Sequence, residues 1–221
     1  MAARGVVVDF DFAAMDGASL LFETARKFLK ELDGIELDVP LEAKYLAGAG
    51  YQEGLARFFA LVKTKKTAQK AARDLAAGFR AALTAAVSKS VGMAFRNFVT
   101  ALVDRGLTVV IATRADVAAV KDAFAPVAGE RVLLYQETSD CYGAVRWDSW
   151  RRACHEVNLP YRQMLAVTGS GFGVKAALRA GMGSLAVVGE HVAYQDFGGA
   201  DAVVGELSGK TARKALEIMR I

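Results

Sequence analysis

Six short apolar segments, separated by helical patterns, constrain the fold of this 221-residue chain most strongly. Four of them indicate buried strands, at residues 6–8, 107–112, 165–167 and 185–188. A fifth, at residues 132–135, indicates a further strand, and a sixth, at residues 202–204, indicates an edge strand. The segments are mostly apolar throughout, without polar residues at alternate positions, which is typical of strands covered on both faces. Strands that alternate with amphipathic helices predict an α/β fold with a mostly parallel, Rossmann-like sheet.

One long segment breaks this alternation. No convincing strand lies between residues 17 and 90, where apolar side chains recur at helical spacing in three stripes. Those stripes are Leu21, Ala25, Phe28 and Leu32; Leu55, Phe58, Phe59 and Val62; and Leu75, Phe79 and Leu83. We therefore expect an all-helical insertion at residues 17–90, directly after the first strand, and an α/β core made of residues 1–16 and 91–221.

Composition narrows the classes of function. Lys plus Arg exceed Asp plus Glu by 28 − 24 = +4, and the one dense basic run, residues 63–70, has no interleaved aromatic residues. This argues against a nucleic-acid-binding module. No apolar stretch reaches the roughly 18 residues that span a membrane, and the first residues lack the pattern of a signal peptide. Two cysteines without CxxC spacing favour the cytoplasm, and two histidines lack the spacing of zinc ligands.

Polar residues follow three of the expected strands. Because ligands of open parallel sheets bind beyond the carboxyl ends of the strands, these residues are the candidates for a functional site. Asp9 and Asp11 follow the first strand, Thr113 and Arg114 the second, and a glycine-rich TGSGFG loop, residues 168–173, another. Two neighbouring carboxylates indicate a nucleophile with a general acid/base, or a Mg²⁺ site, while a plain capping role stays open. Anion binding and simple turn formation both stay open for Thr113 and the loop.

Taken together, the motifs resemble those of the haloacid dehalogenase-like (HAD) hydrolase superfamily. The segment VVVDFDFAAMDG is similar to the family's first motif, LTVVIATR to its second, and AVTGSGFGVKAALRAGM to the segment that normally carries acidic Mg²⁺ ligands. FGGADAVVGEL and YLAGAGYQEGLARFF resemble a late core segment and the entry to a helical cap. The resemblance covers nearly the whole chain and is closest to the helical-cap branch of β-phosphoglucomutase-like and phosphoglycolate-phosphatase-like enzymes. It implies that residues 17–90 are the cap.

The resemblance also implies an activity, the hydrolysis of a small phosphate monoester. Asp9 would be the nucleophile that forms an aspartyl-phosphate, and Asp11 the acid/base. Thr113, Arg114 and Arg146 would bind the phosphoryl group. Mg²⁺ would be held by the Asp9 side chain and the Asp11 backbone carbonyl. Dehalogenation is disfavoured, because enzymes of that type generally lack the second aspartate.

The sequence departs from the family pattern in ways that weaken this Mg²⁺ site. Phe12 and Ala13 stand where the family commonly has Gly and Thr. Thr168 and Gly169 stand where it has an acidic pair, so Gly169 replaces the usual metal ligand. The family's lysine is also missing. Losing the ion and the lysine together would slow phosphoryl transfer on the order of 10²–10⁴-fold or more.

Other residues are candidates to replace the missing groups. Glu137 or Asp140 would supply the acid, and Arg146 or Lys175 the lysine, which is expected near residues 144–145; a solvated surface position is the alternative for each. Two functions therefore stay open. One is a phosphatase-type hydrolase with a small phosphorylated substrate. The other is a catalytically impaired HAD-fold protein that binds a phosphorylated ligand or a protein partner without efficient turnover. The sequence leaves the substrate and the oligomeric state undecided.

Overall fold

The computed structural model describes residues 4–127 and 129–221, and its centre is a parallel sheet of six strands. The strands are β1 (Gly5–Asp9), β2 (Thr108–Thr113), β3 (Val132–Gln136), β4 (Met164–Thr168), β5 (Gly183–Val187) and β6 (Ala202–Val204). Their order is β3-β2-β1-β4-β5-β6, so β1 lies between β2 and β4, with Val7 level with Val110 and Ala166. All six predicted strands are present and the predicted α/β, Rossmann-like fold is confirmed.

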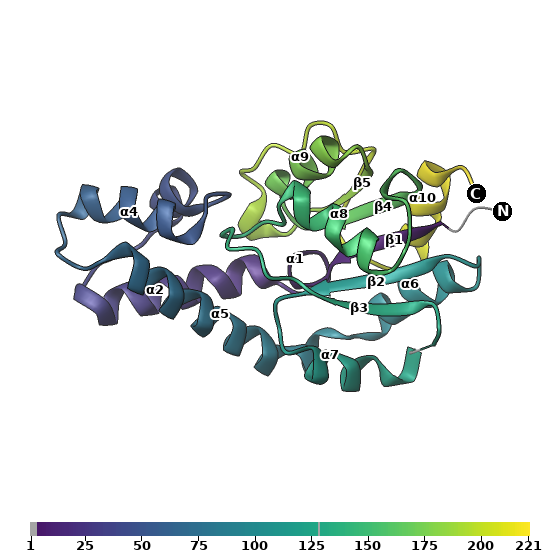
Figure 1. The fold of residues 1–221 in the computed structure, drawn as a ribbon, viewed down its shortest axis with the longest axis horizontal. Coiled ribbons are helices and arrows are strands. Elements are labelled where there is room, and N and C mark those ends of the chain that lie inside the picture. The colour runs from purple at the N-terminus through teal and green to yellow at the C-terminus, as the bar shows by residue number, and fades with distance from the viewer. Residues whose placement is uncertain (1–3, 128) are drawn as a thin grey trace.

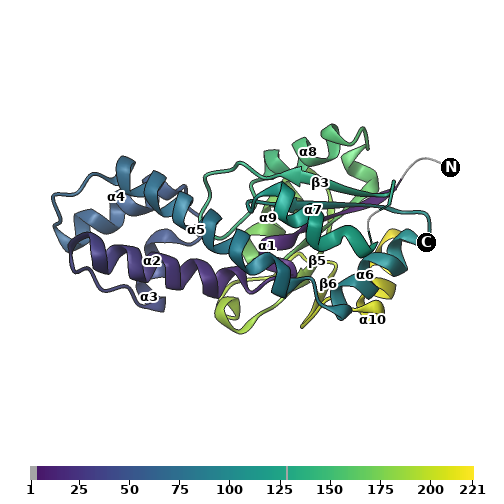
Figure 2. The same cartoon turned by 90° about the horizontal axis from the view of Figure 1, so that it is seen from below.

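Helices cover both faces of the sheet, which explains why its strands are apolar throughout (Figures 1 and 2). Successive strand residues point to opposite faces, so Val6 and Val8 lie in one apolar cluster and Val7 in another. One face is covered by α6 (Met93–Val103), α7 (Val117–Phe124) and α10 (Gly209–Met219), and the other by α8 (Trp147–Glu156) and α9 (Gly171–Ala180). Trp150 of α8 is fully buried, whereas Trp147 at the start of the same helix is 38% exposed.

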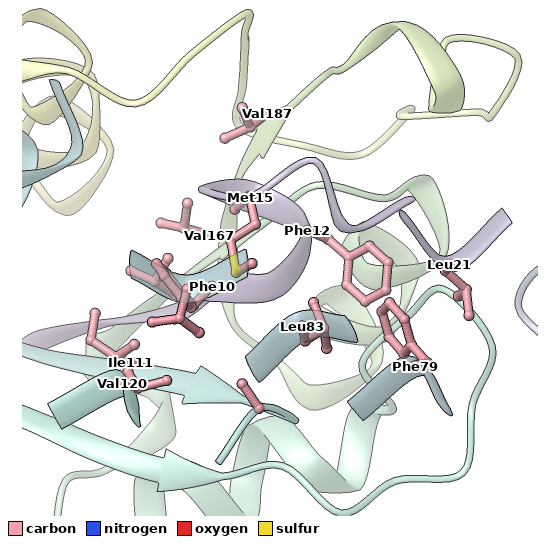
Figure 3. Close-up of a cluster of buried hydrophobic side chains, with 14 of the residues drawn as sticks. Phe10, Phe12, Met15, Leu21, Phe79, Leu83, Ile111, Val120, Val167 and Val187 are labelled. Atoms are coloured by element: carbon pink, nitrogen blue, oxygen red, sulfur yellow. The ribbon is translucent and has the colours of Figure 1, made fainter. Parts of the chain in front are cut away.

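A single helical turn, α1 (Phe10–Ala13), follows β1 and is fixed by aromatic packing. The Phe10 ring lies 5.5 Å from that of Phe95 and 5.4 Å from that of Phe124. Phe12 points the other way, toward Phe79 of the insertion, at 6.1 Å between ring centroids (Figure 3). The backbone that carries Asp9 and Asp11 is therefore held from both sides by large buried side chains.

The insertion is helical from end to end, as the three apolar stripes predict. It comprises α2 (Gly17–Asp33), α3 (Val39–Leu41), the π-helix η1 (Glu42–Leu46), α4 (Tyr51–Val62) and α5 (Ala68–Ser90). Helix α5 packs against both α2 and α4, and the insertion extends from the core at the end opposite the chain termini (Figure 1). It is the helical cap that the resemblance implies. Across the described residues, no helix has both the length and the apolar character that crossing a membrane requires.

Three short helical turns complete the core: η2 (Ala125–Val127), η3 (Tyr161–Gln163) and η4 (Glu190–Val192). The loop of the cap that precedes α4 pairs with a core loop through main-chain hydrogen bonds. The N–H of Gly48 donates to the carbonyl of Tyr142 at 2.9 Å, and the N–H of Tyr142 donates to the carbonyl of Ala49 at 2.8 Å. The N–H of Tyr51 donates to the carbonyl of Asp140 at 2.8 Å. The cap is thus joined to the core by a short stretch of strand-like pairing.

A buried carboxylate adds side-chain contacts to the same junction. Glu42 of the cap is 3% exposed and accepts a hydrogen bond from the Tyr142 hydroxyl at 2.8 Å. Its other oxygen lies 2.9 Å from His191 Nε2 of the core. Burial raises the pKa of Glu42, while His191 and Tyr142 oppose the rise. His191 therefore links the core to the cap through Glu42.

We expect Glu42→Ala to loosen this junction. The change leaves a buried tyrosine hydroxyl and an imidazole without their acceptor, at a cost of about 1–3 kcal/mol. Hydrogen exchange of the amides of Gly48 and Tyr51 should speed up, as measured by mass spectrometry on the intact protein. Glu53→Ala is the control, because Glu53 is exposed and makes only a 4.0 Å contact with Arg57. Equal exchange in both variants would show that Glu42 does not hold the cap.

Candidate functional site

The carboxyl ends of β1, β2 and β4 bring the predicted motif residues to one edge of the sheet. Asp9 is the last residue of β1, Thr113 the last of β2 and Thr168 the last of β4. Between β1 and β4 the strand order changes direction, which is where open α/β sheets bind ligands. Asp9, Asp11, Thr113 and Thr168 are all fully buried here.

Asp11 is held by three donated hydrogen bonds. Its Oδ1 accepts from the Thr113 hydroxyl at 2.6 Å. Its Oδ2 accepts from the backbone N–H of Arg114 at 2.8 Å and from the Arg114 guanidinium at 3.2 Å. The other end of that guanidinium donates to the Ala144 carbonyl at 2.6 Å, and the group lies 5.2 Å from the centre of the Phe12 ring. Arg114 is therefore fixed within the site and only 6% exposed.

Asp9 has weaker partners. Its Oδ2 accepts from the Thr168 hydroxyl at 3.3 Å, and its Oδ1 lies 3.7 Å from Arg114 Nη1. Within the described part of the chain, Oδ1 accepts no hydrogen bond. The Arg114 guanidinium thus faces both aspartates, but of the two only Asp11 accepts a hydrogen bond from it.

A third carboxylate, Glu137, is buried near the same guanidinium. It follows β3 and is 1% exposed, and its Oε1 accepts from the Ser139 N–H at 2.6 Å and the Ser149 hydroxyl at 3.1 Å. Its Oε2 has no hydrogen-bond partner among the residues that the structure describes. Glu137 was one of the two candidates to replace the missing acid, and its burial rules out the solvated surface position.

Burial dominates the electrostatics of the cluster. It raises the pKa of Asp9 to about 8, a rise that Arg114 opposes and Asp11 and Glu137 reinforce. Burial also raises the pKa of Asp11, against the opposing effects of Arg114 and Thr113. Burial alone would lower the pKa of Arg114, but the neighbouring Asp9 and Asp11 carboxyl groups raise it above its usual value. The three donors to Asp11, one of them the Arg114 guanidinium, fit an ionised carboxylate, whereas burial favours the protonated form of Asp9.

The Asp9 proton gives the stability of the protein a defined pH dependence. The folded state keeps a proton that the unfolded chain, with the usual Asp pKa of 3.8, releases. Stability should therefore fall as pH rises from about 4 to about 8, by up to about 1.4 kcal/mol per pH unit. Asp9→Asn resembles the protonated carboxyl group at every pH, so this variant should lack the decrease in stability that Asp9 causes. Urea unfolding at pH 5, 6.5 and 8 measures it, with Asp140→Asn on the surface as control; a wild type that tracks Asp9→Asn at all three pH values would contradict the raised pKa.

The residues at this edge do not fit the Mg²⁺ site that the resemblance implies. A Cβ on Gly169 would lie 1.8 Å from the Phe12 carbonyl oxygen, so this backbone has no room for an acid there. The Asp11 carbonyl oxygen, the expected backbone ligand, lies against Gly17, where a Cβ would be 2.0 Å away. Across residues 4–127 and 129–221, no three His, Cys, Asp or Glu side chains are grouped closely enough to hold a metal ion.

The remaining candidates lie outside the cluster. The Arg146 side chain is 51% exposed and contacts Asp148 at 3.3 Å and Asp140 at 3.7 Å. Lys175 pairs with Asp196 at 2.9 Å on the surface. A predicted phosphate-binding role for Arg146 is therefore not supported by its position. Two groups of the cluster could not be predicted from the sequence, the Ala144 carbonyl and the Ser149 hydroxyl. A backbone carbonyl can accept a hydrogen bond at any residue, so the residue type at position 144 does not reveal it. Ser149 lies in a segment whose tryptophans predict only a helix.

A cleft lies beside the cluster but does not open onto it. It has a volume of about 810 Å³ and runs along the junction of core and cap. Phe12, Met15, Gly169, Glu190 and Tyr194 are among its lining residues, whereas Asp9 and Asp11 are not. A molecule in this cleft would therefore meet Phe12 and Ala13 of α1 and not Asp9 or Asp11.

The strand order, the helical insertion after β1 and the aspartates at the sheet edge define the class of fold: a HAD-like core with a helical cap. Comparison with family models and with curated proteins finds no match. Solved structures do match over almost the full length, which confirms the resemblance to the HAD helical-cap branch at the level of fold.

Three of these structures illustrate the likeness. β-Phosphoglucomutase from Clostridium difficile shares 13% identity at a TM-score of 0.70, over 98% of this chain and 96% of that one. CbbY from Rhodobacter sphaeroides, solved with phosphate, shares 18% at 0.66, over 93% and 95%. A HAD family hydrolase from Deinococcus radiodurans, with bound phosphate and sodium, shares 17% at 0.59, over 99% and 96%. At sequence identities this low, the structural likeness shows a shared fold and nothing more.

Proposed function

We propose that this chain is a HAD-fold protein that acts by binding and does not hydrolyse phosphate esters efficiently. One observation carries this proposal: the Arg114 guanidinium is fixed between Asp9 and Asp11 inside a buried cluster. A nucleophilic Asp9 must be ionised and must reach phosphorus, and an acid/base Asp11 must be free to move a proton. Here Asp9 favours its protonated form and Asp11 is committed to three hydrogen bonds.

The proposed ligand is a phosphorylated small molecule. The support is the shared fold, since CbbY is described in complex with phosphate and, as a mutant, with xylulose-1,5-bisphosphate. In this chain a phosphoryl group at the sheet edge would have to compete with two carboxylates for Arg114. The N–H groups of Gly171 and Gly173 already donate to Gln195 and Ser170. We therefore expect weak binding, with dissociation constants on the order of millimolar, about −4 kcal/mol.

A second candidate, the phosphatase, keeps specific support. Asp9, Asp11 and Thr113 lie at one edge, with the Thr113 hydroxyl 2.6 Å from Asp11, at the junction of core and cap. In this case the cap would open, Asp9 would attack phosphorus, and the substrate's alcohol would leave with a proton from Asp11. Water would then cleave the aspartyl-phosphate, while Arg114 would turn to the phosphoryl oxygens. Positioning and charge neutralisation supply most of the rate in phosphoryl transfer, so the release of Arg114 would be the decisive step.

Turnover assays separate the two candidates. Wild type and Asp9→Asn are incubated with p-nitrophenyl phosphate and a panel of sugar phosphates, with and without Mg²⁺, and released phosphate is measured. We expect the same background release from both proteins. If the wild type releases phosphate and Asp9→Asn does not, the binding proposal is wrong and the phosphatase is the function. Thermal shift with the same panel tests binding: a shift at millimolar ligand supports the proposed ligand class, and no shift with any member rejects it.

A further inference from the structure

We propose that Arg114 takes the place of the divalent metal ion in this fold, as a permanent internal cation for the aspartate pair. The fold otherwise implies Mg²⁺ at this edge, and the residues here do not fit it. The inference concerns what neutralises the carboxylates, so it stands whether or not the protein turns over a substrate.

The position of the guanidinium is the first argument. Arg114 Nη1 lies 3.2 Å from Asp11 Oδ2 and 3.7 Å from Asp9 Oδ1, so one cationic group serves both carboxylates. The Ala144 carbonyl holds the opposite nitrogen at 2.6 Å, and the Phe12 ring covers the group at 5.2 Å. A guanidinium stays charged throughout the physiological pH range and donates in a fixed plane. The Asp11 carboxylate therefore has a cation that does not depend on metal supply, and the same cation lies 3.7 Å from Asp9 whether or not Asp9 is ionised.

The backbone is the second argument. The space that an acidic side chain would need at position 169 is occupied by α1. A Cβ on Gly169 would lie 1.8 Å from the Phe12 carbonyl oxygen, 2.3 Å from the Phe12 carbonyl carbon and 3.0 Å from the Ala13 nitrogen. The close approach of α1 to position 169 thus explains why no acidic residue can stand there. Only glycine allows the two segments to lie this close.

The third argument is the charge count. Asp9 and Asp11 lie 3.7 and 3.2 Å from the Arg114 guanidinium, and Glu137 is also buried; negative charge on these groups raises the pKa of Arg114. A divalent ion between Asp9 and Asp11 would lie next to Arg114 and be repelled by it. Oδ1 of Asp9, which accepts no hydrogen bond from the described residues, lies 3.7 Å from Arg114 Nη1, so this oxygen already faces a positive charge.

Mn²⁺ binding, followed by the loss of the free-ion electron paramagnetic resonance signal, tests the proposal. The full-length, metal-free protein is titrated at pH 7 and at pH 8.5. Wild type should bind no Mn²⁺ below about 1 mM, about −4 kcal/mol. Arg114→Met should bind Mn²⁺ at least about tenfold more tightly, because the repelling charge is gone. Adding Asp9→Asn to that variant should abolish the gain, and Arg146→Met, which removes an exposed arginine, should behave like wild type.

Micromolar Mn²⁺ binding by the wild type that Asp9→Asn abolishes would overturn the proposal. So would an Arg114→Met variant that folds and gains no affinity. If Arg114→Met does not fold, the wild-type and Asp9→Asn titrations alone decide. Phosphatase activity of the wild type without metal would reject the proposed binding function and leave this inference intact, so the two fail separately.

Discussion

Arg114→Met is expected to lower the unfolding free energy by about 3–5 kcal/mol, the usual cost of removing one partner of a buried ion pair. For a chain of this size the melting temperature should fall by about 10 °C. The reason is that Asp11 would keep its buried charge and lose its cation, while the Ala144 carbonyl would lose its donor. Thermal unfolding at pH 7 and urea titration measure the change.

Two further variants make this expectation specific. Arg146→Met removes an arginine whose side chain is 51% exposed, and surface pairs contribute at most about 1 kcal/mol, so its stability should stay near wild type. Adding Asp11→Asn to Arg114→Met removes the unpaired charge and should recover part of the loss. If Arg114→Met and Arg146→Met were equally stable, the ion pair described here would not contribute to the fold.

Gly169→Asp is expected to destabilise the protein by about 3 kcal/mol or more, since a new Cβ collides with main-chain atoms instead of a flexible side chain. The substitution restores the residue type that the HAD pattern has at this position, yet we expect no stabilisation by Mg²⁺. Thermal unfolding of wild type and variant, with and without 10 mM Mg²⁺ (roughly ten times the weak-binding limit given above), measures both effects.

Gly189→Asp is the matched control, because it lies after β5 and nothing is within 4 Å of a Cβ built there. Its stability should change far less than that of Gly169→Asp. A Gly169→Asp protein with near-native stability and a Mg²⁺-dependent rise in melting temperature would mean that α1 can move aside. It would also mean that a single substitution recreates the metal site.

The sheet and the edge that carries the candidate site could be predicted because both follow from local patterns. Strands covered on two faces are apolar without alternation, and parallel topology places their carboxyl ends together. Asp9, Asp11 and Thr113 therefore had to lie near one another once the strands were recognised. The helical stripes of residues 17–90 likewise predict an insertion without any knowledge of its contacts.

The pairing of charges could not be predicted in the same way. Arg114 and Arg146 both stand close to motif positions, yet one is fixed inside the cluster and the other lies on the surface. Which of them is buried depends on the Ala144 carbonyl and on the packing of α1, which are three-dimensional features. The same holds for Glu42, which meets Tyr142 and His191 across 100 and 149 positions of sequence.

The strand-like pairing between the cap loop and the core loop limits how the cap can move. The chain passes between core and cap twice, between α1 and α2 and between α5 and α6. A rigid body attached at two points can rotate about the line through them, but a third attachment removes that rotation. Gly48, Ala49 and Tyr51 provide this third attachment through their bonds to Asp140 and Tyr142. Rotation of the cap away from the core therefore requires that these loop hydrogen bonds break.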